Sequence, residues 1–297
     1  MIRGKPRPGG VDKVFINLCL GLDKLGVAYD INLPFGKLRD DDLVGVLGRG
    51  RHCLRGYERS NPIVAGVALM THPSEWLNLC QEYPVAKYLQ HSEWASNVYK
   101  PFFGERCVVW PVGIDTECWK PATKEDKCND FLIYDKVRWD YERNRIELIE
   151  PIFERLRKKQ LSFENIRYGS YEPSQFQQAL RCSRAMIFLC EHESQGLAYQ
   201  ECLSSGVPIL AWDQGWCLDP NRFKWRQPEI PASSVPYFDE RCGLKFQNVS
   251  HFPDRLDEFL TKLQTGSFRP REYILEKLTL EKCAAGYLKI MQAARES

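Results

Sequence analysis

The sequence has 297 residues, of which 43% are hydrophobic and 27% charged, and its formal net charge is +2. This composition is typical of soluble globular proteins, so it excludes a disordered, collagenous or low-complexity chain. The length favours two domains, because a single compact domain is typically about half as long. None of the twelve cysteines forms a C-x-x-C pair, so we expect no structural zinc site.

Charge and hydropathy indicate where the protein works. No basic and apolar leader opens the chain, and its longest apolar stretch, residues 63–70, is too short to cross a bilayer. We therefore expect a cytoplasmic protein with reduced cysteines. The small net charge argues against nucleic acid as a partner. Residues 1–60 carry eleven Lys or Arg against seven Asp or Glu, which favours either a solvated face or peripheral contact with the cytosolic face of a membrane.

In the first part of the chain, short apolar runs alternate with amphipathic stretches. This pattern is typical of an α/β fold in which crossover helices join parallel strands. A helix at 11–24 comes first and another at 94–103 precedes the last strand; the predicted strands are 27–33, 44–48, 63–70, 85–90 and 108–112. Residues 112–121 and the charged stretch 124–127 predict a linker.

The same alternation continues in the second part. Strands are predicted at 131–136, 166–168, 185–190, 207–212 and 244–246, and helices at 141–159, 173–182, 196–205, 252–264 and 271–294. Residues 214–246 are rich in Pro, Trp and turn-forming residues, so we expect a long functional loop that ends in the short strand.

The most informative stretch runs from Cys190 to Glu201. A strand ends at Cys190, a turn carries Glu193, and a helix opens near Gly196. Free amides at the start of a helix can bind a diphosphate, and a glycine there lets it approach closely. Glu201 lies a turn and a half further on. Two carboxylates can thus bind hydroxyl groups on either side of a diphosphate, as a nucleotide sugar requires.

These residues resemble a known family. Glu193 and Glu201, seven residues apart around Gly196 and followed by Gly206-Val207-Pro208, resemble the Glu-x7-Glu motif of retaining glycosyltransferases with the GT-B fold, of the family 4-like group. Three further passages are similar to that family: Gly9-Gly10 before the first helix, Ser92-Glu93-Trp94 with Pro111-Val112-Gly113-Ile114-Asp115, and Tyr168-Gly169-Ser170. The resemblance covers about residues 9 to 290.

The resemblance implies a fold and a reaction. The fold is two Rossmann-like doubly wound domains that face a cleft: an acceptor-side domain at 1–115, a nucleotide-sugar-binding domain at 116–270, and a C-terminal helix at 271–297 that returns to the first domain. The reaction moves a sugar from a UDP- or GDP-linked donor to a hydroxyl of a glycan, a lipid-linked acceptor or a small molecule. Configuration is retained and neither metal nor cofactor is needed. Polysaccharide biosynthesis is the implied setting.

The resemblance also assigns roles to residues. Glu201 is implied to bind the ribose hydroxyls, Glu193 the donor sugar, and the amides of Gln195, Gly196 and Leu197 the diphosphate. The usual Gly-Arg is absent, so the basic pair that neutralises the leaving group is ambiguous; Lys136 and Arg138 are the expected catalytic pair, and Arg143 is the third candidate, expected to bind the donor. His72, after an apolar strand, is expected either to face the donor sugar as a catalytic residue or to be structural. The remaining predicted donor-binding residues are Gly9, Gly10, Tyr168, Gly169 and Ser194.

Alternatives remain at this stage. A nucleotide-sugar epimerase or hydrolase of the same fold, or a catalytically inactive nucleotide-sugar-binding subunit, would carry the same motifs. A nicotinamide dehydrogenase is disfavoured, because Gly48-Arg49-Gly50 lacks the third glycine of G-x-G-x-x-G. The family has a buried strand before its glycine-rich loop, where this chain offers only Met1-Ile2-Arg3. The first strand is therefore either a stub or missing.

Overall fold

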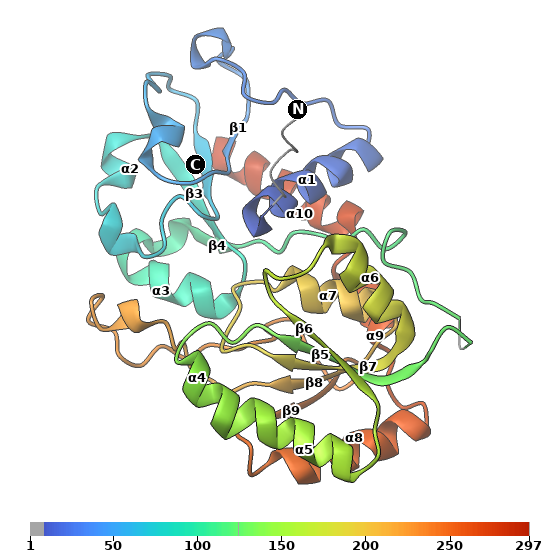
Figure 1. Ribbon diagram of the computed structural model, residues 1–297. Helices are drawn as coiled ribbons and strands as arrows, with labels where there is room; N and C mark the ends of the chain where they lie inside the picture. The colour runs from blue at the N-terminus through green and yellow to red at the C-terminus, as the bar shows by residue number, and fades with distance from the viewer. Residues whose placement is uncertain (1–8, 124, 297) are drawn as a thin grey trace, which may run out of the picture. The chain divides into compact units, whose positions relative to one another are not determined.

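The computed structural model describes residues 9–123 and 125–296 and divides into two compact units (Figure 1). Unit 1 runs to Gly113 and includes the chain from Leu278 onward, and unit 2 is Ile114–Lys277. Each unit contains one sheet whose named strands are all parallel. This confirms the predicted class of two parallel-sheet α/β domains. The predicted stub at Met1-Ile2-Arg3 lies outside the described residues.

Unit 1 has a sheet in the order β1-β2-β3-β4. The strands are β1 (Val44–Val46), β2 (Ile63–Gly66), β3 (Val85–Gln90) and β4 (Cys107–Val109), and the helices are α1 (Gly10–Lys24), α2 (Leu79–Glu82), α3 (Glu93–Phe103) and α10 (Leu280–Arg295). Short 3-10 turns lie at Phe35–Lys37, Arg51–Leu54, Pro73–Glu75 and Gly104–Arg106. Tyr88 and Leu79 are fully buried, and Tyr88 stacks on Tyr99 of α3. Aromatic and aliphatic side chains thus close the core around β3.

The predicted strand at 27–33 is wrong, because these residues are described and form no strand. Gly26 and Asn32 have φ angles of 67° and 54°. A left-handed backbone interrupts the pleat that a strand needs. Ile31 is 51% exposed, so the segment does not bury its apolar side chains either. Among the described strands of this sheet, β1 is therefore at one edge and β4 at the other.

The predicted strand at 63–70 is too long. β2 ends at Gly66, which has a φ of 114°. A side chain there is also excluded, because a Cβ would lie 2.5 Å from the backbone oxygen of Leu89 on β3. The chain then turns into the loop that leads to His72. The glycine therefore allows two neighbouring strands to approach and ends one of them.

The C-terminal helix α10 packs on α1 within unit 1, as predicted for the returning helix. The chain after β4 also approaches α10 closely at Gly113, where a Cβ would lie 2.5 Å from the Cα of Leu280. Trp110 donates from its indole nitrogen to the Cys283 carbonyl oxygen at 2.9 Å. Asn17 of α1 donates to the Gly113 oxygen at 2.8 Å. The chain around Gly113 is therefore held by both helices.

The single helix predicted at 271–294 is wrong in one respect. Two helices occur, α9 (Pro270–Lys277) in unit 2 and α10 in unit 1. The Thr279 hydroxyl accepts a hydrogen bond from the Lys282 amide and so caps a new helix start. The unit boundary consequently falls after Lys277 rather than after residue 270.

Unit 2 has a sheet in the order β6-β5-β7-β8-β9. Its strands are β5 (Asn129–Asp135), β6 (Phe163–Arg167), β7 (Ser183–Leu189), β8 (Ile209–Trp212) and β9 (Gly243–Phe246). Its helices are α4 (Tyr141–Asn144), which continues through a π-helical turn (Arg145–Ile149) into α5 (Glu150–Lys158), then α6 (Pro173–Cys182), α7 (Leu197–Ser204), α8 (Phe252–Gln264) and α9. The loop at 214–242 holds a 3-10 turn (Pro220–Arg222) and a bridge between Trp216 and Pro231.

Alternate residues of β5 bury on opposite faces of the unit 2 sheet. Phe131 and Ile133 belong to the core that α5 and α8 cover. Tyr134 packs on Phe188 of β7 and on Phe176 of α6 on the other face. Figure 1 shows α4 and α5 on one side of these strands and α6 and α7 on the other. Because all five strands are parallel, their carboxyl ends meet at one edge of the sheet.

Candidate functional site at the carboxyl edge of unit 2

Three predicted residues meet where neighbouring strands end. Lys136 follows β5, Tyr168 follows β6, and Glu193 lies in the turn after β7. The Lys136 ammonium forms an ion pair with Glu193 Oε1. The same ammonium lies 4.6 Å from the centre of the Tyr168 ring. The order β6-β5-β7 thus assembles a cation, an anion and an aromatic ring at one point.

The Lys136–Glu193 pair is largely shielded from water, since the two side chains are 14% and 13% exposed. Burial opposes ionisation of the Lys136 ammonium, but the nearby Glu193 carboxylate outweighs it and raises the pKa of Lys136. The lysine is therefore charged at neutral pH. A shielded cation next to a carboxylate can bind a phosphate that arrives with its own negative charge.

Glu193 is also fixed through its backbone. Its amide donates to the Ser233 carbonyl oxygen at 3.0 Å. The Ser233 hydroxyl donates to Asp213 Oδ2 at 2.8 Å, and Lys245 pairs with the same oxygen at 2.8 Å. The long loop after β8 is thus tied to the turn that carries Glu193.

A buried carboxylate that the sequence analysis left without a role, Glu191, joins the two loops of the site. Its Oε1 accepts hydrogen bonds from the amides of Arg138 at 2.8 Å and Trp139 at 3.0 Å. Glu191 is 1% exposed, and burial raises the pKa of its carboxyl although both amides oppose that change. His192 stacks on the Trp139 ring with centroids 5.1 Å apart. The loop after β5 is therefore clamped to the turn after β7.

Helix α7 begins at the predicted position. Gly196 is its N-cap, with a φ of 82°, and a Cβ there would lie 2.3 Å from the ring of Tyr199. Only glycine fits this combination of backbone and space. Gln195 is buried and donates to Gln200 Oε1 at 3.0 Å, so the turn before the helix is held from inside. Ser194 is exposed, and Leu197 is the first helical residue.

Glu201 lies on α7 with only 4% of its surface exposed. The hydroxyl groups of Tyr134 and Tyr171 hydrogen-bond to each other at 2.7 Å. The pKa of Tyr134 is raised mainly by burial and next by the neighbouring Tyr171 hydroxyl. The charges of Glu193 and Glu201 raise it further. The negative charges of both carboxylates of the Glu-x7-Glu spacing thus contribute to the raised pKa of this one hydroxyl.

A second layer supports the strand ends. Asp135 is fully buried and accepts from Arg167 at 2.8 Å and from the Tyr141 hydroxyl at 3.0 Å. The Arg167 guanidinium also lies 3.6 Å from the centre of the Tyr141 ring. A paired and hydrogen-bonded carboxylate can be buried at this depth without an excessive desolvation cost. The pair fixes the end of β5 directly before Lys136.

The other predicted basic residues lie further out. Arg138 is exposed, and its guanidinium lies 5.0 Å from the Trp139 ring. Arg143 pairs with Glu147 on the surface of the helix that begins with α4, at 2.8 Å. Gly169 is exposed and has a φ of 84°. Of the three candidate basic residues, Lys136 is thus the one in contact with Glu193.

Three predicted residues belong to unit 1. Gly9 caps α1 and donates to Asp12 Oδ2 at 2.6 Å, and Gly10 is the first residue of that helix. His72 is 1% exposed and caps a 3-10 turn by accepting from the Ser74 amide at 3.2 Å. These contacts give each of the three residues a local structural role. Their predicted roles toward a donor sugar stay predictions.

Sequence reasoning assigned no role to Glu191, Asp213 or Ser233. For Glu191 a signal exists, because it directly follows a buried strand and its charge has to be satisfied there. Asp213 follows β8 in the same way. Ser233 offers no such signal, since it lies within an irregular loop whose path depends on tertiary contacts.

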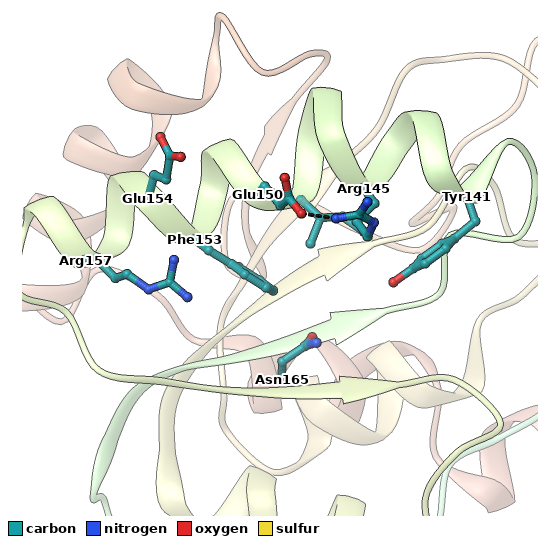
Figure 2. Close-up of a pocket in the computed structure, with 8 residues that line it drawn as sticks. Tyr141, Arg145, Glu150, Phe153, Glu154, Arg157 and Asn165 are labelled. Atoms are coloured by element: carbon teal, nitrogen blue, oxygen red, sulfur yellow. Dashed lines mark hydrogen bonds and ion pairs between the residues drawn. The ribbon is translucent and has the colours of Figure 1, made fainter.

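Two hollows lie elsewhere on the units. A pocket of about 340 Å³ lies between the helix formed by α4 and α5 and the strand β6, and Figure 2 shows Arg145 turned toward Glu150 beside it. Arg145 pairs with Glu150 and with Glu142 at 3.1 Å, so acidic neighbours already balance its charge. A groove of about 950 Å³ in unit 1 is bordered by α1, β1 and α10. Neither hollow is lined by a predicted donor-site residue.

Across residues 9–123 and 125–296, no group of three or more His, Cys, Asp or Glu side chains is arranged to hold a metal ion. None of the helices in that part of the chain has the length and apolar character of a membrane span.

The sequence matches no protein-family model and no curated protein. Its structure is similar to solved structures. TarM shares 15% identity at a TM-score of 0.56 over 80% of this chain and 51% of TarM. AviGT4, a glycosyltransferase involved in avilamycin A biosynthesis, shares 14% identity at a TM-score of 0.51, and the match covers 97% of this chain and 90% of AviGT4. The pneumococcal O-GlcNAc transferase GtfA, solved with UDP and GlcNAc, shares 11% identity at a TM-score of 0.52, and the match covers 83% of this chain and 55% of GtfA.

The chain thus spans about half the length of TarM and of GtfA. At these identities the likeness shows the fold and nothing further. The two parallel-sheet α/β units are those of the GT-B architecture.

Proposed function

We propose that this protein is a retaining glycosyltransferase that moves a sugar from a nucleoside diphosphate donor to an acceptor hydroxyl without a metal ion. The carboxyl edge of unit 2 holds the donor. The observation that carries the proposal is the shielded Lys136–Glu193 pair beside the start of α7. The fold shared with GtfA, whose structure contains UDP and GlcNAc, supports a UDP-linked donor. A glycan or lipid-linked hydroxyl is the proposed acceptor.

The proposed reaction breaks the bond between the sugar C1 and the diphosphate oxygen, and forms a bond from C1 to the acceptor oxygen on the same face. The acceptor proton passes to the departing diphosphate. Negative charge grows on that leaving group, where the Lys136 ammonium and the first amides of α7 stabilise it. Their positions are fixed before the donor arrives, so they need little reorganisation.

Without donor, Glu193 neutralises Lys136. We propose that the donor divides this pair: the diphosphate takes the ammonium, and Glu193 accepts a hydrogen bond from a sugar hydroxyl. Glu201, buried on α7 near the Tyr134 and Tyr171 hydroxyls, is proposed to bind the ribose. This division predicts opposite effects of the two pair partners on nucleotide binding.

The test combines binding and turnover. UDP and GDP sugars are screened by the thermal shift of the protein, and the stabilising donor is then followed by NMR for transfer and for the anomeric configuration of the product. Lys136→Ala is expected to weaken nucleotide binding and to lower kcat by about a hundred- to thousandfold. Glu193→Gln is expected to lower kcat as well but to bind the nucleotide more tightly, because a competing carboxylate is gone.

Lys158→Ala is the matched control. This exposed lysine lies in the last turn of α5, which leads to the start of β6, so it lies near the opposite edge of the sheet from Lys136. It should leave binding and turnover unchanged. Equal loss in Lys136→Ala and Lys158→Ala would refute the assigned role, as would weaker nucleotide binding in Glu193→Gln.

The products separate the competing functions. Sugar transfer with retention supports the proposal. Conversion or hydrolysis of the donor without an acceptor indicates an epimerase or hydrolase of the same fold. Tight nucleotide binding with no turnover against any acceptor indicates an inactive binding subunit.

A further inference from the structure

Two cysteines meet at the amino-terminal edge of the unit 2 sheet. Cys128 directly precedes β5, and Cys182 is the last residue of α6, directly before β7. β5 and β7 pair in parallel with Asn129 opposite Ser183. The Cys128 amide donates to the Cys182 carbonyl oxygen at 2.8 Å. The two cysteines are therefore adjacent across the strands although 53 residues separate them in the sequence.

Their spacing suits a disulfide. Neighbouring strands lie about 4.7–4.9 Å apart. Disulfides join residues whose Cα atoms are about 4.4–6.8 Å apart. Both cysteines are free thiols in the structure, Cys128 exposed and Cys182 half-buried, so small reagents reach the pair from solvent.

The two thiols differ in their exposure and in the groups that surround them. The interaction with Cys128 is the main cause that raises the pKa of Cys182, and burial is the next. Cys128 is the more exposed of the two, so its sulfur meets the reagent first. The Lys127 ammonium donates to the Leu180 and Ser183 oxygens at 3.1 and 2.7 Å, and its charge acts on Cys182. A nearby cation favours the thiolate that a second attack requires.

We propose that Cys128 and Cys182 form a reversible disulfide with small disulfide oxidants such as oxidised glutathione. The Cys128 thiolate attacks one glutathione sulfur, the glutathione disulfide breaks, and one glutathione thiolate leaves. Cys182 loses its proton to solvent, attacks the Cys128 sulfur and displaces the second glutathione. Two protein thiols are oxidised to one disulfide, and one oxidised glutathione is reduced to two thiols.

This site is separate from the proposed donor site. Cys128 and Lys136 flank the two ends of β5, with seven residues of extended chain between them, and lie about 26 Å apart. The link would tie the starts of β5 and β7 together and leave their carboxyl ends unchanged. Oxidation is therefore expected to raise the midpoint of thermal unfolding and to leave nucleotide binding as it is.

Peptide mapping tests the proposal on the whole protein. The folded chain is equilibrated with oxidised glutathione, the remaining thiols are alkylated, and the protein is digested with trypsin. Cleavage after Lys127 and Arg181 gives the peptides 128–136 and 182–184, each with a single cysteine. The expected product is the two peptides joined, with the mass of two hydrogens lost, and it disappears on reduction.

Three variants control for the other thiols. Cys128→Ser and Cys182→Ser should abolish the joined peptide, and Cys118→Ser, which removes another exposed cysteine, should retain it. The wild-type map needs no variant to fold. The proposal would be overturned if Cys128 carried a glutathione adduct and no joined peptide formed, or if no joined peptide appeared under excess oxidised glutathione.

Discussion

Removing the carboxylate of Glu191 should break the hydrogen bonds that join the turn after β7 to the loop after β5. Hydrogen bonds to a charged group contribute about 1.5–3 kcal/mol each to stability. Glu191 Oε1 accepts two, from the amides of Arg138 and Trp139, at 1% exposure of the side chain. The cost of burying the carboxylate offsets part of their sum. We expect Glu191→Ala to lower the free energy of unfolding by about 3 kcal/mol.

For a unit of this size, that loss corresponds to a fall of about 6–12 °C in Tm. Calorimetry at pH 7 measures it. Amide hydrogen exchange should also be roughly tenfold faster or more at Arg138 and Trp139, whereas the amides of α8 should change far less. This local readout separates a lost clamp from a general loss of stability.

Glu191→Gln is the matched variant, because its amide oxygen can still accept both hydrogen bonds. It should keep the slow exchange that Glu191→Ala loses. Burial raises the pKa of Glu191, so the folded wild type holds its proton to a higher pH than the unfolded chain does. The wild type should therefore lose stability relative to Glu191→Gln as the pH rises through that raised pKa. Unchanged Tm and exchange in Glu191→Ala would refute the clamp.

Two further predictions concern stability. Burial lowers the pKa of His91 and of His192 to about 4, so the folded chain binds fewer protons than the unfolded chain between that pH and 6.5. Urea unfolding should show about 2–3 kcal/mol less stability per histidine at pH 4.5 than at pH 7, and equal stability would contradict this. Gly113→Ala should lower Tm because of the contact with Leu280, whereas Gly286→Ala, with open space around it in α10, should raise Tm slightly.

Much of the architecture could be predicted from the sequence, because local patterns determine it. Apolar runs bounded by turn residues marked most strands. The glycine-containing turn before α7 was placed correctly, since a positive φ at Gly196 is a local requirement. The strand at 27–33 failed, because an alternating pattern forms a strand only where a neighbouring strand and a core accept it. The start of α10 was missed, because the cap at Thr279 interrupts an otherwise helical pattern.

The sequence alone determined two α/β units, a helix start flanked by Glu193 and Glu201, and a set of candidate cations near residue 136. Only the tertiary structure selected Lys136 as the partner of Glu193, brought Glu191 under the amides of Arg138 and Trp139, and set Cys128 beside Cys182. The reason is physical. Turns and helix starts depend on neighbours along the chain, whereas these contacts depend on which strands pair and in which register.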